Sequence, residues 1–167
     1  RAAKGACNLY YTNTSGRNDI VEARVAQSGK NVCFYVETDS ALTPVTDNNW
    51  MLLFIDIDRN KSTGWEGYDF VVNRSAKGNG KTVLERNVEG AWKWQAVKDV
   101  KYFTEGNKLV ISIPKKLLSD GGEPLNFEFK WSDNMQEEGN PMDFYVNGDV
   151  APSARFNYVY NTAYEEK

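Results

Sequence analysis

The sequence predicts an all-β fold, a two-sheet antiparallel β-sandwich of jelly-roll type with about eleven strands. Short apolar runs alternate with polar residues, turn residues separate these runs roughly every eight to twelve positions, and helical periodicity is nearly absent. Aromatic residues, which favour strands, make up 13% of the chain. The 167 residues contain no linker or repeat, so we expect a single domain over residues 1–167.

The expected strands follow in order along the chain. Residues 20–26 and 31–38 alternate between apolar and polar positions, and a Ser-Gly turn separates them. Residues 50–58 are apolar on both faces, which predicts a central strand covered on both sides. One helical turn is expected over 115–118, because Pro114 is well suited to begin it. The remaining expected strands are 68–73, 82–87, 92–97, 100–104, 109–113, 125–131, 143–146 and 155–160.

The composition excludes several classes of function. The chain contains no histidine, which removes Ser-His-Asp and Cys-His catalysis as well as His-ligated zinc and haem. The net charge of −3, with both signs interspersed, provides no basic stripe for nucleic acid. No apolar run reaches the length of a membrane-spanning helix. We therefore expect no nucleic-acid partner and no membrane insertion.

The cysteines and the start of the chain bear on its origin. Cys7 and Cys33 are consistent either with one disulfide or with two free thiols. The chain starts Arg1-Ala2-Ala3, without Met or a signal peptide. We therefore expect it to be a fragment of a longer protein.

An acidic loop follows the expected central strand. Asp56, Asp58 and Asn60 alternate where the strand ends, so their side chains are expected to point the same way, and Asp69 follows the loop. Clustered oxygen ligands at the end of a rigid strand suit Ca²⁺, although the rest of the EF-hand pattern is missing. The alternative is a loop whose Asp and Asn side chains bond to its own backbone.

Four aromatic residues are candidates for stacking on sugar rings. Trp92 and Trp94 lie two positions apart and share one strand face, where the alternative is that they simply face the core. Trp65 lies in a turn flanked by glycines, where exposure is easy, and Tyr68 follows it closely.

Arg17 and Arg74 are candidates for hydrogen bonds to sugar hydroxyls. The alternative is that Arg–carboxylate pairs pin the loops between strands. A glycosidase would need two carboxylates at a defined separation, and no spacing among the 23 acidic residues singles out such a pair. We therefore do not expect an enzyme.

Several segments carry a resemblance to a known family. These are the strand 50–58 with its loop, the segment 68–74, the strand 109–113 followed by Pro114, and the Phe-rich strand ending at 133–134. Their order resembles the family 9 carbohydrate-binding modules and the sugar-binding β-sandwich domains of secreted bacterial glycan-processing proteins. The resemblance covers roughly residues 9 to 160.

The resemblance implies a non-catalytic carbohydrate-binding module, secreted or at the cell surface or in the periplasm, often with calcium. Such a module anchors an attached glycan-degrading catalytic domain to a polysaccharide or oligosaccharide. The family clamps sugar between two tryptophans, but residues 46–49 and 150–160 contain no Trp here, so the clamp is absent. The alternative function is a structural accessory domain that packs on a neighbouring catalytic domain without binding sugar.

Overall fold

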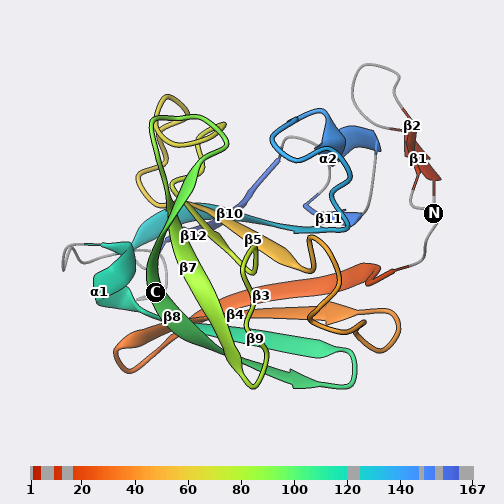
Figure 1. Cartoon of the computed structure of the whole chain (residues 1–167), viewed down its shortest axis with the longest axis horizontal. Helices are drawn as coiled ribbons and strands as arrows, with labels where there is room; N and C mark the ends of the chain where they lie inside the picture. The colour runs from red at the N-terminus through yellow and green to blue at the C-terminus, as the bar shows by residue number, and fades with distance from the viewer. Residues whose placement is uncertain are drawn as a thin grey trace.

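Ten strands form one antiparallel sheet that curls around an interior (Figure 1). The computed structural model describes residues 2–4, 10–12, 17–119, 125–146, 149–152 and 156–161. The strands of the large sheet are β3 (Ile20–Ser28), β4 (Asn31–Thr38), β5 (Leu52–Asp56), β6 (Phe70–Val72), β7 (Lys81–Asn87), β8 (Trp94–Glu105), β9 (Lys108–Pro114), β10 (Asn126–Asp133), β11 (Asp149–Ala151) and β12 (Tyr158–Asn161).

Within the described residues, neighbouring strands of this sheet follow the order β11-β10-β5-β6-β7-β8-β9-β4-β3. Strand β12 also pairs with β10, nearer the start of that strand than β11 does. A separate pair consists of β1 (Ala2–Lys4) and β2 (Tyr10–Thr12).

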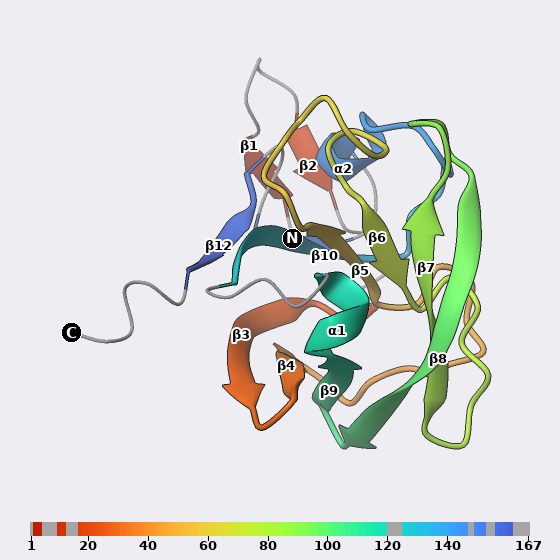
Figure 2. The ribbon, with the colours of Figure 1, turned by 90° about the vertical axis from the view of Figure 1, so that its left-hand side faces the viewer.

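The two edges of the sheet approach each other and nearly close a barrel. The Ile20 N–H in β3 donates to Asp149 Oδ2 in β11, and Gln27 Nε2 in β3 donates to the Tyr160 hydroxyl in β12 at 3.3 Å. Helix α1 (Lys115–Leu118) lies at one end of this barrel (Figure 2). The all-β antiparallel prediction is confirmed. The division into two separate sheets is not, because backbone pairing links all ten strands.

The interior core follows the predicted alternation. Strand β4 buries every second residue, and its Phe34 ring lies 5.7 Å from Phe127 and 5.4 Å from Phe129 of β10. Trp50 and Trp131 are also buried. Leu118 of α1 joins the same core.

Strand β5 has a second apolar face that points out of the barrel. Leu53 and Ile55 face the interior, whereas Leu52 and Phe54 point outward. An outward apolar face must be covered, and here the cover comes from loops and a short helix, α2 (Asp143–Val146). We call the resulting group the outer cluster, which consists of Leu52, Phe54, Trp65, Tyr68, Val71, Met135 and Phe144, with Trp92, Trp94 and Val150 packed against them.

Some sequence predictions of the elements were wrong. Residues 143–146 form α2 and not a strand, because Pro141 starts a helical turn in which Phe144 N–H donates to the Pro141 carbonyl. The expected strands 92–97 and 100–104 are one strand, β8. Residue 50 precedes β5, because Met51 has a φ of +42° that interrupts extended backbone.

Three further expectations concern the cysteines, the last strand and membrane insertion. Cys33 is a half-buried free thiol, and Cys7 lies outside the described residues. The last expected strand begins at Tyr158, whereas residues 153–155 lie outside the described part. None of the helices described is long and apolar enough to cross a membrane.

Candidate functional site

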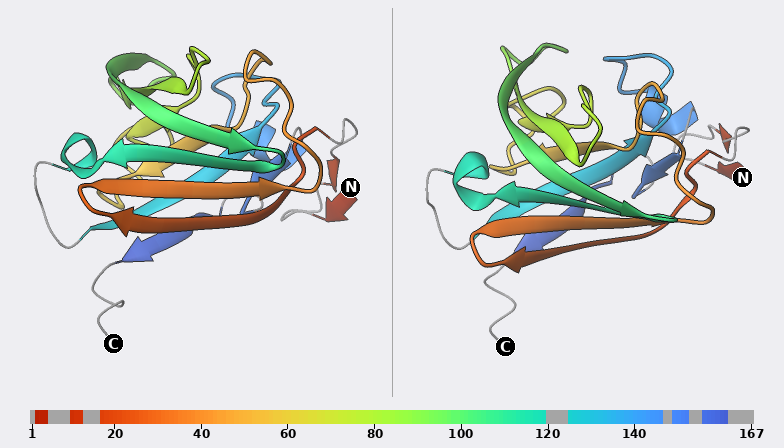
Figure 3. Two further views of the ribbon diagram at one scale, coloured as in Figure 1. Left: turned by 90° about the horizontal axis from the view of Figure 1, so that it is seen from below. Right: turned by 60° about the horizontal axis from the view of Figure 1, so that its bottom comes forward.

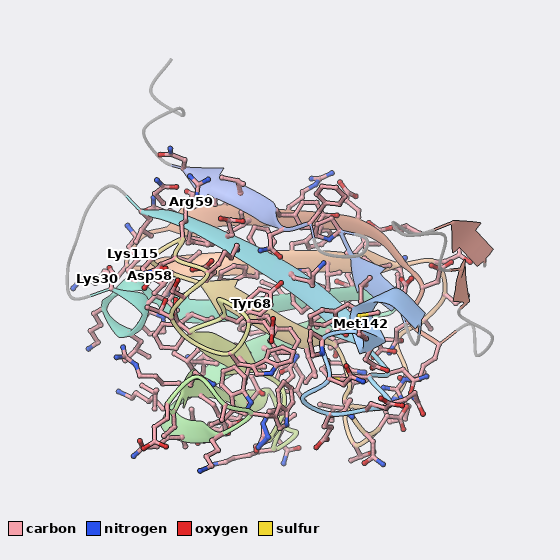
Figure 4. All side chains as sticks on the ribbon, turned by 90° about the horizontal axis from the view of Figure 1, so that it is seen from above. Lys30, Asp58, Arg59, Tyr68, Lys115 and Met142 are labelled. Carbon is pink, nitrogen blue, oxygen red and sulfur yellow. The ribbon has the colours of Figure 1, made fainter. Side chains whose placement is uncertain are left out.

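The predicted stacking residues Trp65 and Tyr68 lie inside the outer cluster. Each is only 4% exposed, and their ring centroids lie 5.6 Å and 5.2 Å from that of Phe54. The expectation that Trp65 is exposed was wrong. Reciprocal backbone hydrogen bonds between Trp65 and Tyr68, at 2.9 and 2.8 Å, close a tight turn that directs both rings onto the outer face of β5. Figure 4 shows Tyr68 between the loop that carries Asp58 and the segment that carries Met142.

Trp92 and Trp94 are half-buried against the same cluster. Their ring centroids lie 5.5 Å apart with the planes at 88°, and Trp92 contacts Trp65 edge-on at 4.6 Å. A flat platform for sugar rings needs coplanar faces open to solvent, whereas these indoles are perpendicular and packed. The alternative interpretation of Trp92 and Trp94 as packing residues matches their arrangement.

The structure brings the carboxylates of Asp56, Asp58 and Asp69 together. One oxygen from each lies within 4.8 Å of the others. Asp56 ends β5 and Asp69 immediately precedes β6, which pairs antiparallel with β5, so the register places both at the same edge. A cleft of about 480 Å³ opens beside Asp58 and Asp69, and Arg86, Asn87 and Glu89 also line it. We call the three carboxylates the acidic triad.

Burial and mutual repulsion shift the triad's proton affinities apart. Burial is the largest cause that raises the pKa of Asp69 to about 6; the negative charges of Asp58 and Asp56 act in the same direction, and a hydrogen bond from the Ile57 N–H opposes them. Burial also raises the pKa of Asp56, against the opposing effect of Lys61. For Asp58 burial acts in the same direction, but hydrogen bonds from Thr63 and the Asn60 N–H outweigh it and lower the pKa. Crowded carboxylates of this kind are the donor set of a hard cation.

The same loop is extensively bonded to itself, as the alternative interpretation expected. The Asn60 N–H donates to Asp58 Oδ1 at 3.0 Å, and Asn60 Oδ1 accepts the Ser62 N–H at 2.9 Å. Lys61 Nζ lies 2.9 Å from Asp56 Oδ2 and 3.3 Å from a Glu128 oxygen. Asn60 therefore serves the loop backbone, and the residues that fit a cation are the three carboxylates.

Arg17 forms a bidentate ion pair with buried Asp133. Arg17 Nε and Nη2 donate to the two Asp133 oxygens at 2.9 and 3.1 Å. Asp133 also accepts the Met51 N–H at 2.9 Å. These contacts hold the segments around Arg17 and Met51 against the end of β10. They match the alternative interpretation, in which Arg–carboxylate pairs fix the loops between strands.

Arg74 stands exposed at the end of β6. Its guanidinium carbon lies 5.9 Å from the Trp92 ring centroid, and its Nε lies 3.5 Å from Glu85 Oε1. The side chain is 27% exposed and therefore rests against the rim of the outer cluster.

Arg17 and Arg74, which the sequence offered as sugar-binding candidates, border two adjoining clefts, and sequence reasoning did not single out most of the other residues that line these clefts. The clefts measure about 410 and 440 Å³, and we call them together the polar groove. Both are lined by Asp47, Asn48, Asn49 and Gln136, the first also by Arg17, Asn134 and Met135, and the second also by Val45, Thr46, Asn73, Arg74, Ser75, Ala76 and Glu138.

The backbone around the polar groove is unusual. Asn49, Asn73 and Asn134 line it with φ values of +51°, +77° and +61°, and Met51 beneath them has +42°. Such values are uncommon outside glycine and cluster at functional sites, most tellingly for a bulky residue such as Met. The order of the strands was the signal that could have revealed the groove. These asparagines precede β5 or follow its two neighbours β6 and β10, so antiparallel pairing brings them together at one end of the three strands.

Comparisons with known proteins add no relative. No protein-family model matches the chain, and neither the curated proteins nor the solved structures contain a match.

Proposed function

We propose that this chain is a non-catalytic carbohydrate-binding module whose ligand site is the polar groove. The observation that carries the proposal is the lining of the groove, where amide, carboxylate and guanidinium groups converge over two connected clefts. Amides supply both donors and acceptors, which matches the mixed hydrogen-bonding character of sugar hydroxyls.

The groove is held in place before any ligand arrives. Asn49 Nδ2 donates to the Met135 carbonyl and Asn73 Nδ2 to the Met51 carbonyl, both at 2.7 Å, and Gln136 Nε2 donates to Asn134. Side chains fixed in this way lose little conformational entropy on binding, which favours affinity.

The module would act by proximity. Binding to a polysaccharide raises the effective concentration of a catalytic domain in the same parent chain, in a secreted, cell-surface or periplasmic setting. The resemblance to family 9 modules supports this setting. It also favours describing the curled sheet as a sandwich of two facing layers.

Native gels cast with soluble polysaccharides test the proposal. We expect one neutral polymer to retard the wild type, and Asn48→Ala, at an exposed position of the groove, to abolish the retardation at unchanged melting temperature. Arg74→Ala should also abolish the retardation, but at a lower melting temperature, because buried Glu85 loses its ion-pair partner. Gln95→Ala, exposed at the start of β8, is the matched control. No retardation across a broad panel would refute the proposal and favour the structural accessory domain.

We propose further that the acidic triad binds Ca²⁺. Asp56, Asp58 and Asp69 would hold the ion, and the ion would lock the loop between β5 and β6. Titration of EDTA-treated protein with CaCl₂ should release heat and raise the melting temperature, by about 2.7 kcal/mol of stability at a hundredfold excess over Kd. Asp58→Asn should abolish both effects and Asp39→Asn neither. A wild type that shows no heat and no shift would exclude the ion.

A further inference from the structure

The loop between β5 and β6 carries a sequence motif that accepts N-linked glycans. The motif is Asn-x-Ser/Thr with any residue except proline at x, and it occurs at Asn13-Thr14-Ser15, Asn60-Lys61-Ser62 and Asn73-Arg74-Ser75. A motif this short also arises by chance, so the surroundings of each asparagine decide whether a transferase can use it. Asn13 lies outside the described residues, and the structure therefore compares Asn60 with Asn73.

The motif at Asn60 lies on the surface of a projecting loop. In Figure 1 the segment between β5 and β6 rises on the side of the barrel opposite β3, β4 and β9, and Figure 3 shows these three strands in front of it. Asn60, Lys61 and Ser62 are all exposed. Exposed loops of this kind are where N-linked glycans, which are bulky and hydrophilic, are found on folded proteins.

The Asn60 side chain is held in a way that leaves its nitrogen available. Asn60 Oδ1 accepts the Ser62 N–H at 2.9 Å, and the Asn60 carbonyl accepts the Thr63 N–H at 3.2 Å, which closes the turn. Among the described residues, neither Asn60 Nδ2 nor the Ser62 hydroxyl has a hydrogen-bond partner. The atom that would carry the glycan and the hydroxyl that completes the motif are therefore both accessible.

Asn73 satisfies the same sequence requirement in unsuitable surroundings. It is 4% exposed, and its Nδ2 donates to the Met51 carbonyl at 2.7 Å. A glycan on this nitrogen would replace the donated hydrogen bond and leave the buried Met51 carbonyl unsatisfied, which is costly. Asn73 therefore serves as an internal comparison, because it has the motif without the exposure.

We propose that Asn60 is an acceptor site for an N-linked glycan. In the reaction, Asn60 Nδ2 forms a bond to C1 of an oligosaccharide that is carried on a polyisoprenyl diphosphate. The bond between C1 and the diphosphate oxygen breaks, the lipid diphosphate leaves, and Nδ2 gives up one proton to the transferase. Because Oδ1 and not Nδ2 holds the turn, the glycan can be attached without breaking a hydrogen bond. The proposal takes only the exported setting from the proposed function and uses no residue of the polar groove.

Incubation of the folded full chain with a purified oligosaccharyltransferase and a lipid-linked oligosaccharide tests the proposal. The transferase is one that reads only the three-residue motif, and Asn13→Gln is present throughout, so that the intact mass reports on the two described motifs. We expect the protein to gain the mass of one glycan, which peptide mapping places at Asn60. Asn60→Gln and Ser62→Ala should each abolish the gain, the latter at unchanged melting temperature because its hydroxyl has no partner. Ser75→Ala, which removes the motif at Asn73, is the matched control and should keep the gain.

Three results would overturn the proposal. The first is a chain that stays unmodified while an acceptor peptide in the same mixture is glycosylated. The second is a glycan that Ser62→Ala does not remove, and the third is a glycan at Asn73 in place of Asn60. None of these results depends on retardation by polysaccharides in gels, so this proposal and that of the polar groove succeed or fail separately.

Discussion

Replacement of Lys130 by Met should stabilise the protein near neutral pH. Lys130 lies in β10 opposite Phe54 and is completely buried on the outer-cluster side of the sheet. Its Nζ donates to the Pro152 carbonyl at 2.7 Å and lies 5.4 Å from the Phe144 ring centroid. Burial, together with a smaller effect of the positive charge of Lys61, lowers the pKa of this amine from 10.5 to about 7.

The sign and size of the effect follow from this pKa. Between pH 7 and 10.5 the unfolded chain binds a proton that the folded chain has released, so stability rises with pH across this window. At or below pH 7 the full cost of the buried amine applies, about 5 kcal/mol. Met removes this cost but leaves the Pro152 carbonyl without its donor, which costs about 1–3 kcal/mol. The net gain is about 2–4 kcal/mol near pH 6.5, and it disappears or reverses near pH 10.

Urea unfolding followed by tryptophan fluorescence at both pH values measures this difference. Lys98→Met, which removes an exposed lysine, is the control and should change little at either pH. A Lys130→Met variant that is destabilised equally at pH 6.5 and pH 10 would refute the reasoning, because the amine would then be charged in the folded protein at an ordinary pKa.

The remaining predictions concern the supports of the two loop regions, each measured by urea unfolding. Arg17→Ala should cost about 3–5 kcal/mol, because it leaves the buried Asp133 carboxylate without its cation, and Asp133→Asn in the same background should recover part of the loss. Trp65→Ala should cost about 3–5 kcal/mol by opening a cavity in the outer cluster, and a loss below 1 kcal/mol would mean that the ring is not packed. Gly64→Ala should destabilise far more than Gly29→Ala, since both have positive φ but only at Gly64 would the new Cβ collide with backbone.

The fold class was readable from the sequence because burial in strands has a period of two. The alternation in 31–38 and the two-sided apolar run after Trp50 correctly identified a strand with one buried face and a strand covered on both faces. The sequence could not show that all ten strands belong to one nearly closed sheet. The two edges of the sheet meet through contacts between distant segments, such as that of Ile20 with Asp149.

The candidate site was harder to predict, because exposure is a property of the whole fold. Glycines around Trp65 suggested an open turn, yet the turn folds back onto Phe54. The acidic residues gathered as predicted, since their strand and its partner end at one edge. Of the polar groove the sequence suggested only Arg17 and Arg74 as binding candidates, because the asparagines that line it come from three separate segments and show no spacing within any one of them.

The outer cluster explains how the chain uses its many aromatic residues. Strand β5 is apolar on both faces, and within the described residues the only helix over its outer face is the four-residue α2. Bulky rings from two loops and from α2 complete the cover: Trp65 from the acidic loop, Trp92 from the segment before β8, and Phe144 from α2. Rings used in this way are no longer available to stack on a ligand. The proposed carbohydrate binding therefore relies on the polar side chains that line the groove.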